Sequence, residues 1–225
     1  MDIVSCGHST QIVNTILFDL DGTLVDSANE TSAVLNAMRA ERGLGPLEDS
    51  QFRPLISYGA GSLVKSALNP RDEDLQPLID AFRAQYSTLK TPISSIYPSV
   101  VETLSALKKR GLKLGICTNK PQNLCENVLR DTALAGFFEC VIAGGPAIRP
   151  KPHYEPVHLA MSDLGADVST TVLVGDSTTD QRAAQAAGVP FIFFASGYDD
   201  GVVEDQTVAS IGQMSELLDL DLFNA

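Results

Sequence analysis

Short apolar runs alternate with amphipathic segments over most of the chain, and this alternation predicts its secondary structure. Continuous apolar runs, which are typical of buried strands, occupy residues 16–18, 172–174 and 191–194, and mostly apolar segments that each contain one charged residue and also predict strands occupy 112–117 and 137–143. Apolar residues recur at helical spacing over residues 99–110, 121–130, 178–187 and a segment that ends near residue 164. Ser99 and Glu102 have the spacing of a capping box, and the tail adds a strand at 208–211 and a helix at 215–222. Strands separated by such helices pair in parallel, so the pattern predicts a doubly wound, Rossmann-like α/β sheet.

The block from residue 27 to residue 94 interrupts this pattern, because nothing in it alternates like a strand. Ser27 is placed to cap a helix over residues 28–42, and shorter helical pieces are expected at 50–57 and 62–68. The clearest helix covers residues 72–89, where three- and four-residue spacing relates Leu75, Leu78, Ile79, Phe82, Tyr86 and Leu89. We therefore expect a small all-helical cap domain over residues 27–94, inserted into an α/β core made of residues 1–26 and 95–225.

Composition narrows the classes of function. The chain has 225 residues and a formal net charge of −12, so it lacks the basic excess that nucleic-acid binding requires, and we expect no nucleic-acid partner. No apolar run is long enough to predict a membrane span, and residues 1–14 do not read as a signal peptide. The cysteines lack the paired spacing of a zinc site and are Cys6, Cys117, Cys125 and Cys140. We expect free thiols and a cytoplasmic protein.

Polar residues that can take part in chemistry follow the predicted strands. Asp19 and Asp21 end the first strand, and on their own they fit an acidic turn as well as a metal-bound nucleophile with a second acid beside it. Further candidates follow later strands and are Thr118, Asn119, Lys151, Asp176 and Asp180. Ligands of a doubly wound sheet gather beyond the carboxyl ends of its strands. Together these residues offer a nucleophile, oxygen ligands for Mg²⁺ and cations for phosphoryl oxygens, as metal-assisted phosphoryl transfer requires.

Four segments, in this order, resemble the motifs of the haloacid dehalogenase superfamily. They are residues 19–23 (DLDGT), 118–119 (TN), 151–152 (KP) and 175–180 (GDSTTD). The resemblance covers essentially the whole chain, and the helical block is similar to that family's small cap. It implies that three residues hold the phosphate, namely Thr118, Asn119 and Lys151.

The resemblance also implies a catalytic mechanism. Asp19 would attack phosphorus to form an aspartyl-phosphate, and Asp21 would protonate the leaving group and then deprotonate water. Mg²⁺ would be bound by Asp19, by Asp176 and by the backbone carbonyl of Asp21, and Asp180 would order this cluster. Dehalogenation is disfavoured, because family members with that activity lack an acid at the position of Asp21.

Within the superfamily the chain most resembles phosphoglycolate phosphatases, on segments such as TNKP at 118–121 and SGY at 196–198. Phosphoglycolate is therefore the expected substrate, and the expected partner is a small phosphorylated metabolite. The pair His153-Tyr154 departs from the usual pattern after the lysine, which leaves another small phosphate, such as a sugar phosphate, as an alternative. Oligomeric state is not predicted by the sequence.

Substrate choice is expected to come from the cap, because the core contacts only the phosphoryl group. The backbone N–H groups of residues 58–62 stand before a short helix, and with Arg53 or Lys65 they are candidates to hold a substrate carboxylate. An ordinary turn between helices explains the same residues equally well. Lys120 is placed to reach the phosphate, but a residue of this kind more often faces solvent, which is the expectation here. His153 is expected to lie at the surface or at a helix start.

Three other functions fit parts of the pattern. A β-phosphoglucomutase-like phosphomutase would share the nucleophile and the metal, but such mutases tend to carry Glu-Asp where this chain has Gly175-Asp176. A phospho-acceptor signalling domain is much shorter and has no helical cap. A catalytically inactive binding protein is conceivable, but every expected catalytic position is filled. The sequence therefore favours a phosphatase.

Overall fold

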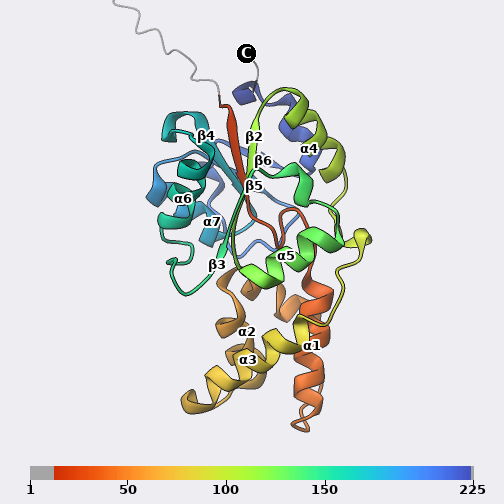
Figure 1. The fold of residues 1–225 in the computed structure, drawn as a ribbon. Coiled ribbons are helices and arrows are strands. Elements are labelled where there is room, and N and C mark those ends of the chain that lie inside the picture. Colours follow the sequence, from red (N-terminus) through yellow and green to blue (C-terminus); the bar gives the residue numbers. More distant parts are fainter. Residues whose placement is uncertain (1–12, 224–225) are drawn as a thin grey trace, which may run out of the picture.

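The computed structural model describes residues 13–223, which contain a parallel six-stranded sheet with helices on both faces (Figure 1). The strands are β1 (Thr15–Phe18), β2 (Lys113–Pro121), β3 (Cys140–Gly144), β4 (Thr171–Gly175), β5 (Phe191–Phe194) and β6 (Ala209–Ile211). They lie in the order β3-β2-β1-β4-β5-β6, so the chain reverses the direction of sheet growth beside β1. In such sheets ligands bind beyond the carboxyl ends of the strands, next to this reversal.

Two pairs of helices sandwich the sheet. The core helices are α4 (Val100–Lys109), α5 (Gln122–Asp131), α6 (Glu155–Leu164) and α7 (Thr178–Ala187). Because side chains alternate along a strand, Ile16 and Phe18 of β1 pack with α4 and α5 on one face, whereas Leu17 packs with α6 and α7 on the other. All three side chains are fully buried. Continuous apolar strands therefore have a direct physical cause here, since both faces of the sheet are covered.

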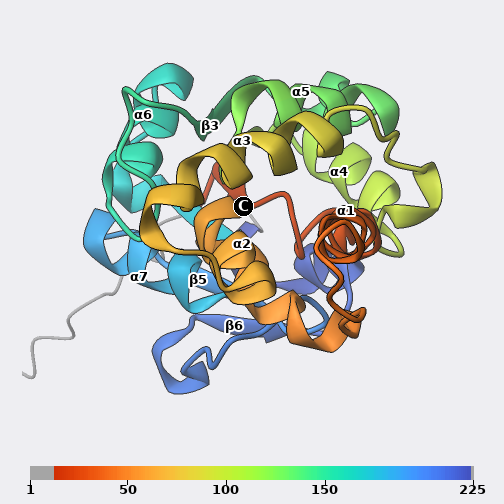
Figure 2. The same cartoon turned by 90° about the horizontal axis from the view of Figure 1, so that it is seen from below.

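A helical layer covers the carboxyl ends of the strands (Figures 1 and 2). Its helices are α1 (Ala28–Ala40), α2 (Ala60–Leu68) and α3 (Leu75–Tyr86), joined by the short 3₁₀ helices η1 (Asp49–Gln51), η2 (Arg53–Tyr58) and η3 (Asp72–Asp74). These elements share a hydrophobic cluster of their own, in which Leu35, Phe52 and Phe82 are buried. Leu124 and Tyr198 of the sheet region join this cluster, so apolar contacts as well as the chain connections hold the layer against the core.

The doubly wound parallel sheet predicted from the sequence is confirmed, with several local corrections. The strand expected over 137–143 begins at Cys140, because the preceding residues form a 3₁₀ turn, η5 (Ala135–Phe137). The helix expected over 215–222 is wrong: extended backbone at Leu220 divides that stretch into the 3₁₀ helices η8 (Met214–Asp219) and η9 (Asp221–Phe223). The remaining 3₁₀ helices are η4 (Ile93–Ser95), η6 (Val168–Thr170) and η7 (Glu204–Gln206).

Two predicted helix caps are also wrong. Ser99 has a left-handed backbone with φ of 65°, and its side chain makes no hydrogen bond to the first turn of α4. An N-cap side chain reaches that turn from an extended backbone, so the capping box cannot form. Ser27 makes no cap bond either, because its hydroxyl donates to Asp21 Oδ1 at 2.5 Å. The sequence pattern predicted a helix cap at Ser27, whereas its hydroxyl binds Asp21, which follows β1.

Cys6 lies outside the described residues, and the other three cysteines are free and buried, as expected. Burial raises the pKa of the Cys117 thiol to about 12, so this group stays protonated at neutral pH. Within residues 13–223 no helix combines the length and the apolar character that a membrane crossing requires.

Helix α4 offers a matched test of how much the core packing contributes. Leu104 is fully buried against the sheet, whereas Val101, on the outer face of the same helix, is 38% exposed. We predict that Leu104→Ala lowers the free energy of unfolding by about 2–5 kcal/mol, because it leaves a cavity in the core. Val101→Ala should change it by less than about 0.5 kcal/mol. Urea unfolding followed by circular dichroism measures both, and equal losses would contradict the assigned packing.

Candidate active site

The register of the sheet places the first predicted acid between two other strand ends. Phe18 of β1 pairs with Ile116 of β2 and with Val174 of β4. Asp19 follows directly, and its backbone N–H donates to the Val174 carbonyl at 2.9 Å. The acid therefore comes beside Cys117, where the regular pairing of β2 with β3 is interrupted, and beside Gly175, the last residue of β4. Residues far apart in the sequence meet here because β2 and β4 both lie in parallel beside β1.

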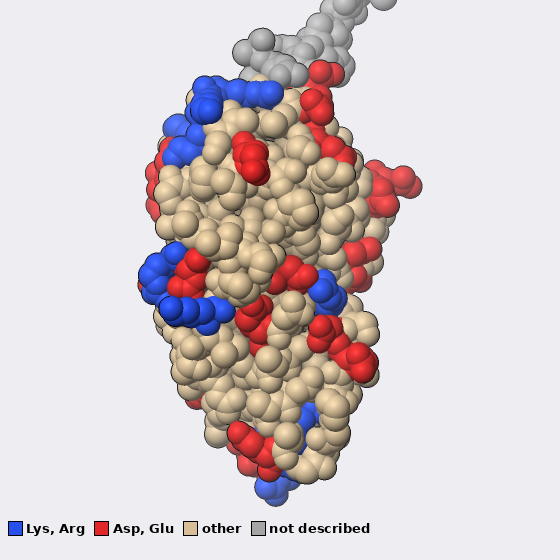
Figure 3. Space-filling model, turned by 90° about the vertical axis from the view of Figure 1, so that its right-hand side faces the viewer, with Lys and Arg blue, Asp and Glu red and all other residues tan. Residues whose placement is uncertain are grey.

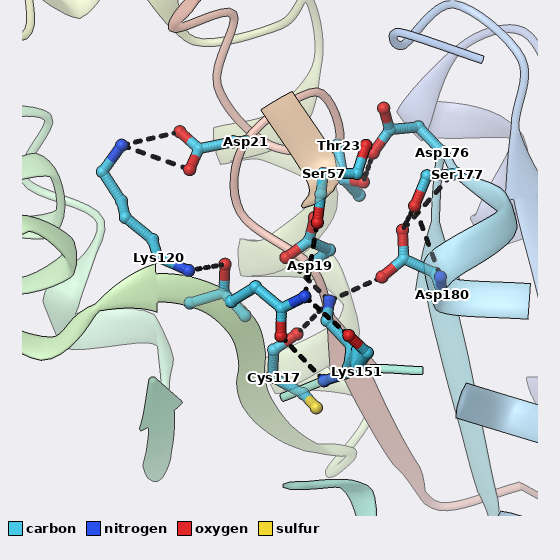
Figure 4. A network of polar contacts seen from close by, with 12 residues as sticks. Asp19, Asp21, Thr23, Ser57, Cys117, Lys120, Lys151, Asp176, Ser177 and Asp180 are labelled. Atoms are coloured by element: carbon cyan, nitrogen blue, oxygen red, sulfur yellow. Dashed lines mark hydrogen bonds and ion pairs between the residues drawn. The ribbon is translucent and has the colours of Figure 1, made fainter. Parts of the chain in front are cut away.

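Lys151 is buried at the centre of this edge (Figure 4). Its Nζ lies 2.9 Å from Asp19 Oδ1, donates to Asp180 Oδ1 at 2.5 Å and donates to the Cys117 carbonyl at 2.6 Å. Burial alone would lower the pKa of Lys151, but the charges of Asp180 and Asp19 raise it above its ordinary value. The ammonium therefore remains charged inside the protein.

Asn119 holds the backbone around this lysine. Its Nδ2 donates to the Lys151 carbonyl at 2.9 Å, and its Oδ1 accepts from the Lys151 N–H at 2.8 Å. The same amide nitrogen donates to the carbonyl of Ser57, a residue of η2, at 3.3 Å. Thr118, the preceding residue, is buried, and its Oγ1 accepts from the backbone N–H of Lys120 at 3.3 Å. Asn119 thus orients the lysine and also contacts the helical layer.

Asp176 lies at the end of β4, in a space that two glycines leave open. Its Oδ1 accepts from Thr23 Oγ1 and its Oδ2 from the Tyr198 N–H, each at 2.8 Å. Gly22 has φ of 88°, and a Cβ at this position would lie 2.2 Å from Asp176 Oδ2. A Cβ at Gly197 would lie equally close to the Asp176 Cβ, at 2.2 Å. The chain after β1 can approach this carboxylate only without side chains there.

The donor set fits a divalent cation. Carboxylate oxygens of Asp19, Asp176 and Asp180 lie within 4.8 Å of one another, and all three side chains are buried. The Lys151 ammonium pairs with Asp19 and Asp180 but not with Asp176, so one positive charge stands against three carboxylates. Burial raises the pKa of Asp19 to about 6, and burial with the charges of Asp180 and Asp19 raises the pKa of Asp176. Buried negative charge in excess, with a ring of hard oxygen atoms, is what an ion such as Mg²⁺ compensates.

Asp180 accepts more hydrogen bonds than Asp19 or Asp176 within the described residues. Besides its contact with Lys151, its Oδ2 accepts from Ser177 Oγ at 2.5 Å and from the Ser177 N–H at 3.2 Å. The Asp180 N–H donates in return to Ser177 Oγ at 3.3 Å, and together with the bond from the Ser177 N–H this forms a capping box at the start of α7. The helix cap fixes the acid, and the acid in turn fixes the lysine.

The second predicted acid, Asp21, points to a different set of partners. Lys120 Nζ donates to Asp21 Oδ1 at 3.0 Å and to Oδ2 at 3.1 Å, and Tyr86 Oη accepts from the same ammonium at 3.1 Å. The expectation that Lys120 faces solvent is wrong, because its side chain is only 7% exposed. Burial lowers its pKa, but Asp21 and Tyr86 raise it above the ordinary value. Lys120 follows Thr118 by two residues on the same strand, and alternate residues of a strand share a face. This spacing could have predicted that Lys120 faces the site.

A pocket opens between the helical layer and this edge of the sheet. Asp21, Asn119 and Lys120 line it from the core, and residues of η2, α2 and α3 line it from the other side, including Gly59, Ala60, Phe82, Arg83 and Tyr86. The loop at Gly59 and Ala60 is therefore at the pocket, as the sequence suggested.

The two basic residues that were expected to hold a substrate carboxylate together with this loop, Arg53 and Lys65, lie outside the pocket. Arg53 donates to Asp26 at 2.8 Å, and Lys65 lies 3.8 Å from Asp72; neither lines the pocket. The pocket's cation from the helical layer is Arg83, which the sequence did not single out. Arg83 is exposed on the polar side of an amphipathic helix, and the sequence pattern there does not distinguish a residue that contacts a ligand from one that only contacts solvent.

Another residue of the helical layer, Ser57, lines a small cavity together with Asp19, Thr118 and Lys151. Its Oγ is buried and has no hydrogen-bond partner within residues 13–223. On the face shown in Figure 3, charged side chains gather at the waist between core and helical layer, with acids and bases interspersed rather than joined in a basic face. His153, which forms a pair with Arg149 near the surface, is not part of the site.

The structure thus brings together seven of the predicted residues, which are Asp19, Asp21, Thr118, Asn119, Lys151, Asp176 and Asp180. Residues 16–194 match the family described as haloacid dehalogenase-like hydrolase. The chain belongs to this family. The hydrolase is 40% identical over 195 residues to a phosphoglycolate phosphatase of Caulobacter vibrioides, which covers 84% of this chain and 82% of that protein.

Other relatives extend the comparison. The hydrolase is 33% identical to an N-acetylmuramic acid 6-phosphate phosphatase of Pseudomonas aeruginosa, over 83% of this chain and 83% of that protein. A solved structure of a predicted phosphoglycolate phosphatase from Haemophilus somnus superimposes with a TM-score of 0.83 at 24% identity, covering 95% of this chain and 99% of that one. The structural likeness supports the fold, and the sequence relatives place the chain with hydrolases of phosphoric monoesters.

The approach of Gly22 to Asp176 gives a prediction with a matched control. Gly22 and Gly43 both have positive φ, but a Cβ at Gly43 would meet nothing within 4 Å. Both alanine variants carry the same backbone strain of about 1–2 kcal/mol. We predict that Gly22→Ala lowers hydrolysis of 4-nitrophenyl phosphate at least ~100-fold, because a 1 Å shift of a catalytic group has that effect. Gly43→Ala should retain activity within twofold of wild type, and a comparable loss in both variants would refute the close approach.

Proposed function

We propose that this hydrolase is a Mg²⁺-dependent phosphatase whose nucleophile is Asp19. The observation that carries the proposal is the buried pair of Asp19 Oδ1 and Lys151 Nζ, 2.9 Å apart, in a cavity that Thr118 and Asn119 also line. Apart from this ion pair, Asp19 Oδ1 has no polar partner within residues 13–223, so no other donor competes for it. A carboxylate in this state, beside an ammonium that can bind a phosphoryl oxygen, is arranged for attack on phosphorus.

In the first step, an oxygen of Asp19 attacks phosphorus and the bond from phosphorus to the leaving oxygen breaks. Protonated Asp21 gives its proton to that oxygen, so the alcohol departs neutral and Asp21 becomes a carboxylate. Lys151 and the Thr118 hydroxyl hold the phosphoryl oxygens. The hydroxyl of Thr118 is free to donate, because its oxygen accepts from the Lys120 N–H.

In the second step, water attacks the phosphorus of the aspartyl-phosphate and the bond from phosphorus to Asp19 breaks. Asp21 takes the proton of the water, which returns both acids to their starting states and releases inorganic phosphate. Mg²⁺, held by Asp19, Asp176 and the Asp21 carbonyl, would neutralise charge on the phosphoryl group. Asp180 and Asn119 act by orienting Lys151.

We further propose that residues 27–94 act as a cap that selects the substrate. The support is that this segment has its own hydrophobic cluster and contributes one side of the pocket next to the phosphoryl cavity. Arg83 is the guanidinium of that side and forms no ion pair with any residue of the described chain. A cation at this place favours a substrate with a second negative group.

Phosphoglycolate is the substrate that fits best. The substrates in the names of two relatives, phosphoglycolate and N-acetylmuramic acid 6-phosphate, both carry a carboxylate in addition to the phosphoryl group. A carboxylate-bearing phosphomonoester is therefore the class to test first, and the sugar phosphate is the second candidate. Ranking both against ethyl phosphate by kcat/KM, with and without Mg²⁺, decides between them.

Asp19→Asn tests the mechanism. We predict that it removes at least ~10⁴-fold of the Mg²⁺-dependent activity, since an amide is not a nucleophile toward phosphorus. The fold should survive, because the amide keeps the volume of the side chain, and circular dichroism and thermal unfolding measure this. Asp163→Asn, at an exposed acid of α6, is the control and should match wild type. Full activity of the Asp19 variant would overturn the covalent mechanism.

Arg83→Met tests the substrate class. A hydrogen bond to a charged group contributes about 1.5–3 kcal/mol, so kcat/KM for phosphoglycolate should fall roughly 10–100-fold. The value for ethyl phosphate, which has no carboxylate, should change by less than about threefold. Arg71→Met is the control, because Arg71 pairs with Asp74 outside the pocket. Equal losses on both substrates would remove Arg83 from carboxylate recognition.

A further inference from the structure

Lys120 and Asp21 form a buried ion pair that the catalytic steps above do not use. Their side chains are 7% and 11% exposed. A buried charge that loses its partner destabilises a protein strongly, so each member of such a pair constrains where the other can lie. The pair thus fixes the position of the proposed proton donor.

The hydrogen bonds around this pair leave little freedom. Asp21 Oδ1 accepts from Ser27 Oγ at 2.5 Å and from Lys120 Nζ at 3.0 Å, and Asp21 Oδ2 accepts from the same ammonium at 3.1 Å. An ammonium has three protons, and the third is donated to Tyr86 Oη at 3.1 Å. The Lys120 Nζ also lies 4.5 Å from the centre of the Tyr86 ring. Every proton of the ammonium therefore has a partner.

The partners come from three separate parts of the chain. Asp21 follows β1, Lys120 belongs to β2, and Tyr86 is the last residue of α3 in the helical layer. One lysine therefore links α3 of the layer to Asp21 (Figure 4 shows the lysine and the acid). A displacement of α3 removes the hydrogen bond to Tyr86, which among the described residues is the one bond of the ammonium that does not go to the carboxylate.

We propose that Lys120 is the positioning residue of Asp21, and that Tyr86 makes this positioning depend on the seating of α3. The inference rests on the proposed function, because it assigns Lys120 to the acid of that mechanism. Ser27 fixes one carboxylate oxygen, and Lys120 fixes the rotation of the carboxylate plane by binding both oxygens. An Asp21 without Lys120 would present its proton to the leaving oxygen in the wrong direction.

A positioning role has a kinetic signature that a structural role lacks. kcat/KM includes only the steps up to departure of the leaving group, and in those steps Asp21 acts as an acid. A phenolate requires that proton far more than a 4-nitrophenolate, which is a stable anion. Loss of Lys120 should therefore affect phenyl phosphate and spare 4-nitrophenyl phosphate, although the two molecules bind through the same groups.

The experiment compares Lys120→Met and Tyr86→Phe with wild type on these two substrates and on phosphoglycolate, with Mg²⁺ present. For Lys120→Met we expect kcat/KM on phenyl phosphate to fall about 100-fold, the effect of a misplaced catalytic group, and on 4-nitrophenyl phosphate less than about threefold. Tyr86→Phe removes one hydroxyl and keeps the ring, so it should show the same selectivity with a loss of about fivefold on phenyl phosphate. Tyr86→Phe keeps the test valid if Lys120→Met does not fold.

Lys113→Met is the matched control. Lys113 lies at the opposite end of the same strand, and its ammonium donates to the Leu164 carbonyl at 2.6 Å. This variant loses a lysine hydrogen bond without touching the site, so both substrates should keep wild-type rates. Thermal unfolding of all variants separates changes in activity from loss of the folded state.

Three results would overturn the proposal. Equal losses on phenyl and 4-nitrophenyl phosphate would show that Lys120 supports only the structure. A loss confined to phosphoglycolate, with both aryl phosphates unchanged, would show that Lys120 binds the substrate's second anion. Selectivity in Lys120→Met but none in Tyr86→Phe would remove the link to α3. Failure of the proposed function itself is distinct, because then wild type would hydrolyse neither substrate in an Asp19-dependent way.

Discussion

Buried negative charge at the joint end of β1 and β4 is the constraint on which the site depends. Asp19, Asp176 and Asp180 are brought within 4.8 Å of one another, in a place where water cannot screen them. Lys151 compensates part of this charge through contacts of 2.9 Å and 2.5 Å with Asp19 and Asp180. Most of the surrounding hydrogen bonds hold these four groups in place. The remaining excess of negative charge creates the demand for a cation that the proposed chemistry uses.

The two ends of the pocket have different tasks, and the structure separates them. The core end holds the groups that would act on phosphorus, while the helical layer adds Arg83, Tyr86 and Ser57. Asp21 is the point of contact between these ends, because Lys120 joins it to Tyr86. A single buried lysine can in this way make the chemistry depend on how the helical layer is seated.

Much of the fold could be predicted from the sequence, because its strands are buried on both faces and its helices on one. Those two patterns have different periods, so β1 and α3 were identifiable without tertiary information. The errors fell where local patterns compete. Ser99 and Glu102 have capping-box spacing, but the backbone at Ser99 is left-handed. The segment around Leu220 has helical spacing, yet extended backbone at Leu220 divides it into two 3₁₀ helices.

The sequence by itself determined which polar residues follow the apolar runs, and with them the candidates Asp19, Thr118, Lys151 and Asp176, since parallel strands bring the residues beyond their apolar runs to one edge. Only the tertiary structure decided the partners of long side chains. Lys120 could have reached solvent, and Arg53 could have reached the pocket, because flexible side chains select among several partners. The hydrogen bond between Lys120 and Tyr86 of α3 helps to hold the lysine at Asp21, and an ion pair with Asp26 keeps Arg53 out of the pocket.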